Sequence, residues 1–127
     1  MRRVALIFAA AIAAFTTASA AEKAMTGTQL TELLSGGITI KLGGPGMGYS
    51  GELVLTADGK GKGEAKTEDG KNTFVLEGMW EVKGDTFCRR WAAFDDGKEV
   101  CETWIIIEPN KVRVAVDGKD VGVNSWD

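Results

Sequence analysis

The sequence contains no histidine. This absence excludes catalytic triads with a histidine base, imidazole acid–base catalysis and histidine-containing metal sites. The chain has only two cysteines, Cys88 and Cys101, which are too few for a cysteine zinc site and too far apart for a C-x-x-C redox pair. We therefore expect no cofactor, no metal ion and no enzymatic activity.

Two further ligand motifs are absent or defective. The glycine-rich segment Gly43–Gly48 is not followed by the Gly-Lys-Ser/Thr of a phosphate-binding loop, and we predict an irregular, mobile connection there. The stretch Asp58–Asp69 has the length of an EF-hand loop with glycine at its sixth position. Lys60 and Lys62, however, stand where calcium requires oxygen ligands. The sequence predicts neither nucleotide nor calcium binding.

Long apolar runs are missing except near the N-terminus. Arg2 and Arg3 precede the apolar run from Val4 to Phe15, and Ala18-Ser19-Ala20 follows. A positive start, an apolar stretch and a small-residue A-x-A site are typical of a secretory signal peptide. The run is shorter than the roughly 20 residues that span a bilayer as a helix. We predict cleavage between Ala20 and Ala21, with no stable membrane anchor afterwards.

The cleaved protein is expected to be one domain from residue 21 to 127 in the periplasm or the secreted fraction. Removing Arg2 and Arg3 changes the formal charge from −3 to −5. Nucleic-acid binding requires clustered basic residues, so we exclude it. In an exported protein, Cys88 and Cys101 are expected to form a disulfide.

One short helix is expected at the start of this domain. Thr26 and Gln29 have the spacing of a capping box, which satisfies backbone N–H groups at a helix start. The apolar face consists of Leu30, Leu33 and Leu34, and the pair Gly36-Gly37 then ends the helix.

The rest of the chain predicts an all-β fold. Asp-Gly and similar pairs recur every 8 to 15 residues, between short stretches that alternate apolar and polar side chains. Strands are expected near 38–42, 51–57, 61–67, 72–77, 79–83, 86–93, 99–107, 111–117 and 120–124, with Gly78 at a bulge or bend. The run Trp104–Ile107 is expected to be the most deeply buried. The predicted fold is an antiparallel meander in a strongly curved sheet or small barrel, with the helix at one end or against an edge.

The predicted disulfide conflicts with the simplest hairpin register. A four-residue loop at Asp95–Gly97 would place Cys88 opposite Thr103, one diagonal away from Cys101. We expect a bulge in this hairpin to bring the two cysteines together.

Aromatic and basic residues cluster in the same region. They form the candidate binding surface: Trp80, Arg89, Arg90, Trp91 and Trp104. Tryptophan and arginine dominate binding hot spots, and arginine stacks on aromatic rings. The alternative is that the tryptophans fill the core while the arginines cover them with their aliphatic stems.

The segment from Thr26 to Gly36 resembles the start of small exported proteobacterial proteins of unknown function. The pattern Gly-x-Trp…Gly-Asp-x-x-Cys-x-x-Trp…Cys, here from Gly78 to Cys101, is similar to their middle region. Glu102 departs from relatives that carry an aromatic residue directly after the second cysteine. The resemblance implies a periplasmic location and a compact β fold, and it implies no activity.

These observations together predict a non-enzymatic binding or protein-interaction module. Its partner would be an unknown protein or a small ligand in the periplasm. The alternative function is inhibition of a secreted hydrolase, which rests on analogy between folds alone.

Overall fold

The computed structural model describes residues 22–127. The predicted signal peptide, residues 1–20, lies outside the described residues, as does Ala21. Within residues 22–127, no helix has both the length and the apolar character needed to cross a membrane.

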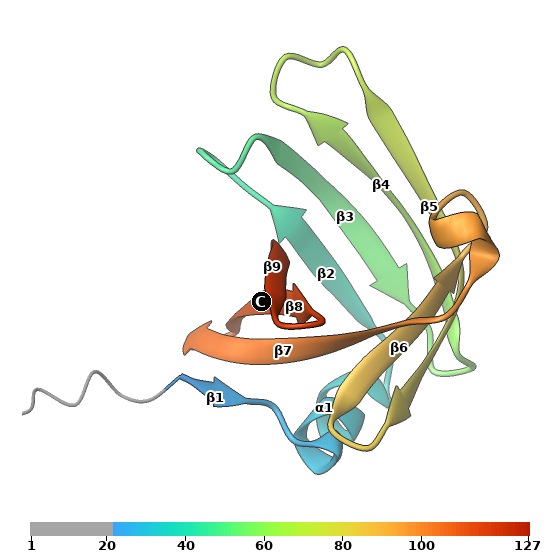
Figure 1. Ribbon diagram of the computed structural model, residues 1–127, viewed down its shortest axis with the longest axis vertical. Helices are drawn as coiled ribbons and strands as arrows, with labels where there is room; N and C mark the ends of the chain where they lie inside the picture. The colour runs from blue at the N-terminus through green and yellow to red at the C-terminus, as the bar shows by residue number, and fades with distance from the viewer. Residues whose placement is uncertain (1–21) are drawn as a thin grey trace, which may run out of the picture.

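The predicted all-β antiparallel meander is confirmed, and of the two arrangements that the sequence left open, a curved sheet or a barrel, the strands form a closed barrel (Figure 1). Each of the strands β2 to β9 pairs with its neighbour in the chain, and pairing of β9 with β2 closes the circle. Closure gives each of these strands a neighbour on both sides, although β9 and β2 pair only where Lys41 lies opposite Ser125 and Leu42 opposite Asn124. The strands are β2 (Ile38–Gly43), β3 (Tyr49–Leu55), β4 (Lys60–Thr67), β5 (Thr73–Lys83), β6 (Thr86–Trp91), β7 (Val100–Glu108), β8 (Lys111–Val116) and β9 (Lys119–Ser125).

A further short strand, β1 (Lys23–Ala24), was not predicted. It pairs with β7, where Lys23 lies opposite Ile106 and Ala24 opposite Ile105. The β6 partner of β7 ends before this point, since β6 pairs with β7 only as far as Glu102. β1 therefore occupies the edge of β7 that β6 leaves free.

The predicted helix, α1 (Gly27–Leu34), closes one end of the barrel (Figure 1). Thr26 and Gln29 form the expected capping box, and Leu30 and Leu34 are fully buried. The N–H of Gly27 also donates to Asp85 Oδ1 at 2.7 Å, which fixes the helix start to the β5–β6 turn. A short helix is unstable by itself in water, so α1 packs at this end, where its leucines are buried against the side chains of the barrel interior.

Large side chains fill the half of the barrel next to α1. Trp104 is fully buried, and its ring centroid lies 4.9 Å from that of Phe87. Ile40, Leu55 and Val112 are buried beside these rings. This half is a packed hydrophobic core, so any ligand space must lie in the other half.

Gly78 lies inside β5 and marks no bulge, so the prediction of two strands at 72–77 and 79–83 is wrong. β5 is one strand, and Gly78 pairs in register with both Gly61 and Trp91. A Cβ on Gly61 would lie 2.7 Å from the Trp91 ring, so glycine is needed there because the indole lies on it. A Cβ on Gly78 would collide first with the Arg90 carbonyl oxygen on β6 and would also lie 3.1 Å from the Trp91 ring.

The prediction for Trp104–Ile107 is also wrong. Trp104 is fully buried, but Ile106 and Ile107 are each 37% exposed. The reason is their position at the end of β7 beside the β7–β8 turn, where the barrel interior stops. A continuous apolar run is therefore no proof of burial on both faces in a closed antiparallel barrel.

The predicted disulfide between Cys88 and Cys101 is present, and the predicted bulge is wrong. Cys88 and Cys101 are direct cross-strand partners with Cα atoms 3.9 Å apart, and the β6–β7 register shows no shift. The loop is longer than four residues and contains a 3₁₀ turn at Asp95–Gly97. Asp95 and Asp96 both adopt positive φ angles there, and this turn sets the register that the sequence pattern did not predict.

Candidate functional site

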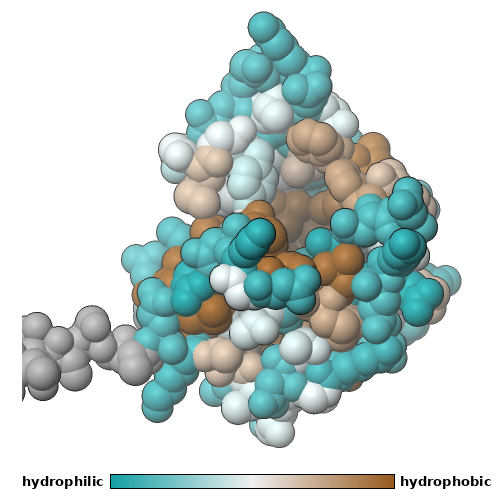
Figure 2. Space-filling model, viewed as in Figure 1, coloured by the Kyte–Doolittle hydropathy of each residue, from teal (hydrophilic) through white to brown (hydrophobic). Residues whose placement is uncertain are grey.

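The open half of the barrel contains a cavity of about 280 Å³. Figure 2 shows the hollow on this face of the molecule, with hydrophobic residues inside it. The lining comes from nearly every strand and from the β6–β7 loop: Leu42, Tyr49, Leu53, Ala65, Phe74, Leu76, Phe87, Arg89, Trp91, Phe94, Asp95, Glu102, Val114, Val121, Gly122 and Asn124. An eight-stranded barrel has an interior just wide enough to be filled by side chains or to hold one small ligand.

Most of the wall is apolar. Leu53, Ala65 and Val114 are buried inward-facing residues of β3, β4 and β8. Phe74 and Val121 lie nearer the solvent and remain 40% and 55% exposed. Small-molecule sites in proteins are mostly apolar cavities with a few placed polar groups, and this cavity has that composition.

The β6–β7 loop, residues 92–99, covers part of the opening. The Phe94 ring lies against that of Phe74, with centroids 6.1 Å apart. Asp95 follows directly and accepts a hydrogen bond from Arg89 Nη1 at 3.0 Å. At the opening, the loop is therefore attached to the barrel by this aromatic contact and this ion pair. At its two ends, Ala92 N–H donates to the Glu77 carbonyl and Glu99 accepts from Lys83.

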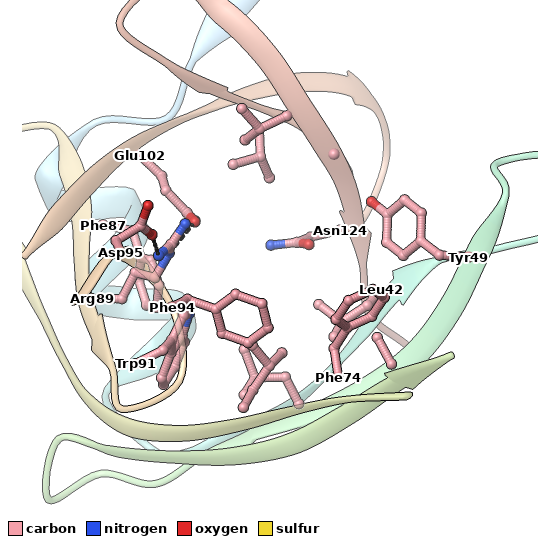
Figure 3. A pocket seen from close by; sticks show the side chains of 16 residues that line it. Leu42, Tyr49, Phe74, Phe87, Arg89, Trp91, Phe94, Asp95, Glu102 and Asn124 are labelled. Carbon is pink, nitrogen blue, oxygen red and sulfur yellow. Dashed lines mark hydrogen bonds and ion pairs between the residues drawn. The ribbon is translucent and has the colours of Figure 1, made fainter. Parts of the chain in front are cut away.

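An ordered ion pair lies at the inner end of the cavity (Figure 3). Arg89 Nε donates to Glu102 Oε2 at 2.8 Å, and Trp104 Nε1 donates to Glu102 Oε1 at 3.0 Å. The Arg89 and Glu102 side chains are only 14% and 10% exposed. Because the fully buried Trp104 fixes the carboxylate, Glu102 in turn fixes the guanidinium in a single position.

The surroundings of Arg89 favour its charged form. Burial is the largest effect and acts to lower the pKa of the guanidinium, whereas the hydrogen bonds and charges of Glu102 and Asp95 raise it. The net result is a pKa above the ordinary value, so Arg89 stays positively charged at every physiological pH.

Asn124 is the second polar group inside the cavity. It is a residue of β9, only 8% exposed, and its side chain points into the space toward Arg89 and Glu102 (Figure 3). Within residues 22–127 its amide has no hydrogen-bond partner. Every buried side-chain nitrogen and oxygen among these residues has a partner, so the Asn124 amide is reached by solvent from the cavity. The hydroxyl of Tyr49, by contrast, already accepts from the N–H of Val123 at 3.1 Å. Asn124 thus presents an unused donor and an unused acceptor to the cavity.

The structure divides the predicted binding residues among three places. Arg89 and Trp91 line the cavity. Trp104 and the partly buried Trp80 belong to the packed half, where the Trp80 indole donates to the carbonyl oxygens of Thr56 and Lys60. Arg90 lies on the outer face, with its side chain 62% exposed. The five residues do not form one surface, because neighbouring strand positions face opposite sides of the barrel.

Sequence reasoning missed Glu102, Asp95 and Asn124 as site residues. A signal for the ion pair was present, since Arg89 lies between Phe87 and Trp91 at strand spacing and therefore shares their inward face. An inward arginine needs a buried partner, and Glu102 stands two positions before Trp104. No pattern indicated Asn124, whose strand contains two glycine-adjacent valines and little else that is apolar.

A cluster of possible metal ligands outside the cavity holds no candidate metal centre. Cys88, Glu99 and Cys101 lie close together on the outer face. Both sulfur atoms are joined in the disulfide, and Glu99 accepts two hydrogen bonds at 2.9 Å from Lys83 Nζ. The hydrogen bond from Lys83 is the main cause that lowers the pKa of Glu99, so this carboxylate is committed to an ion pair.

Comparison with known proteins found no matching family model, no similar curated protein and no similar solved structure. The functional argument therefore rests on the cavity itself.

Proposed function

We propose that this protein is an exported, non-enzymatic binding protein that holds one small ligand inside the barrel. The observation that supports this most strongly is the amide of Asn124, which faces a mostly apolar cavity and has no hydrogen-bond partner among residues 22–127. The amide is open to the cavity and is therefore free to bind a ligand.

The cavity also differs from a packing defect. A well-packed core leaves few voids larger than a water molecule, whereas this cavity measures about 280 Å³. Cavities that stay empty are apolar, whereas this one contains a fixed ion pair and the Asn124 amide. The cavity therefore combines sufficient volume, an opening to solvent and polar side chains in defined positions, as a ligand site requires.

Export belongs to the same proposal. The signal-like N-terminus and the Cys88–Cys101 disulfide both fit an oxidising compartment such as the periplasm. A ligand-binding role suits a sequence that contains no histidine.

Filling the cavity tests the proposal. Ala65→Leu adds three carbon atoms to an inward-facing side chain that lines the space. We expect it to weaken binding of octan-1-ol at least tenfold in isothermal titration calorimetry, while the thermal midpoint stays equal or rises because a void is filled.

The matched control is Glu64→Leu, which places the same side chain on the outward-facing neighbour in β4. It should leave octan-1-ol binding unchanged. Equal affinity in the wild-type protein and in Ala65→Leu would show that the ligand binds elsewhere and would refute the proposal.

A further inference from the structure

The charges around the cavity restrict which head group a ligand can carry. Among the lining residues, only Arg89 is positive, and only Glu102 and Asp95 are negative. The resting cavity therefore carries a formal charge of −1, and its single cation already has an anionic partner at 2.8 Å and another at 3.0 Å.

A charged head group would fit this arrangement poorly. A carboxylate would bring a third negative group toward one guanidinium, and an ammonium would have to lie beside Arg89. Taking an ion out of water costs several kcal/mol unless a partner compensates, and the charged lining residues are already paired with one another. An uncharged group meets no such cost.

Hydrogen bonding adds a second restriction. Arg89 has five N–H donors, and its hydrogen bonds to Glu102 and Asp95 use two of them. Asn124 offers both a donor and an acceptor. A head group that accepts from Arg89 and forms a donor–acceptor pair with Asn124 would satisfy both residues, and a primary carboxamide has this combination.

The size of the cavity limits the apolar tail of the ligand. A volume of about 280 Å³ is at the lower end for small-molecule sites, so the ligand must be small. Beyond the head group, a short apolar chain would lie against Leu53, Val114 and Phe74.

We propose that the cavity selects a small uncharged amphiphile, with a carboxamide-type head between Arg89 and Asn124 and a short apolar tail toward the opening. This inference rests on the proposed function and adds the chemical class of its ligand.

The test is a head-group series on the unmodified protein at pH 7. Octanamide, octan-1-ol, octanoate and octylammonium share the same chain length and differ only at the head. Isothermal titration calorimetry should give the tightest binding for octanamide, with octanoate and octylammonium weaker by at least about tenfold, since each leaves a buried polar or charged group uncompensated.

Two variants locate the selectivity. Asn124→Leu should remove the advantage of octanamide over octan-1-ol, and the matched change Asn72→Leu in the exposed β4–β5 turn should not. Asp95→Asn removes one negative charge and should strengthen octanoate binding several-fold, whereas Asp96→Asn, next in the same turn, should not.

The outcomes separate the two proposals. Equal binding of all four compounds, or tightest binding of octanoate or octylammonium, would overturn the head-group inference and leave the cavity as a binding site. Binding of none of them at millimolar concentration would overturn both. Because the main series uses the wild-type chain, its result does not depend on whether any variant folds.

Discussion

At the residue scale, the decisive feature is that the cavity contains a charged pair and a free amide at inward positions. The alternation Phe87, Arg89, Trp91 predicts an inward arginine, and this much can be derived from the sequence. That Glu102 is its partner depends on the β6–β7 register, which the Asp95–Gly97 turn sets. Positive φ at two consecutive aspartates is uncommon for residues other than glycine, and no simple hairpin rule predicts it.

Removing one member of the ion pair is expected to cost more than removing both. Glu102→Ala leaves the Arg89 guanidinium and the Trp104 indole N–H without their buried acceptor. We predict a loss of about 3–5 kcal/mol in the free energy of unfolding in urea. The double variant Arg89→Met, Glu102→Leu replaces both charges with apolar side chains and should recover most of this loss.

The free energies of unfolding of both variants and of the wild type can be compared by thermal and urea denaturation. A double variant as unstable as Glu102→Ala would mean that the pair stabilises the fold in itself, and it would weaken the view that these charges are retained for binding.

At the element scale, the β6–β7 hairpin contains both the links that stabilise this part of the barrel and the loop at the cavity opening. The disulfide links the two strands on the outer face, Arg89 and Glu102 join them on the inner face, and the loop between them reaches the opening through Phe94. The helix, most strands and the disulfide were predictable, because capping, alternation and turn chemistry are local signals. The continuity of β5 could not be predicted, because a glycine inside a strand pattern usually indicates a bulge or bend. Only the structure shows that Gly78 lies against β6 and the Trp91 ring.

The disulfide is expected to stabilise mainly by restricting the unfolded chain. The two cysteines are 13 residues apart, which corresponds to about 3 kcal/mol in the chain-entropy description. The double variant Cys88→Ala, Cys101→Ala should lose about this amount in urea unfolding.

Wild-type protein under a reducing agent is the control and should unfold at nearly the same urea concentration as the double variant. A reduced wild type that keeps its full stability would show that the β6–β7 hairpin does not need the covalent link.

At the scale of the whole molecule, the two halves of the barrel differ in packing. α1 and the buried aromatic rings close one half, and the other half keeps 280 Å³ of space with an opening beside the β6–β7 loop. The sequence predicts a curved sheet or barrel, but closure depends on the β9–β2 pairing between distant segments, which no local pattern encodes. The cavity likewise exists only in the closed barrel. From the sequence, only its aromatic and basic lining residues Arg89 and Trp91 were recognised as candidates.

The most direct test of this account is an NMR measurement of where octanamide binds. β3 provides an internal comparison, because Leu53 points into the cavity and is 4% exposed, whereas its neighbour Val54 points outward and is 44% exposed. The account predicts intermolecular nuclear Overhauser effects from the octanamide chain to the methyl groups of Leu53 and Val114, and none to those of Val54. Contacts to Val54 without contacts to Leu53 would place the ligand on the outer surface and contradict the central claim.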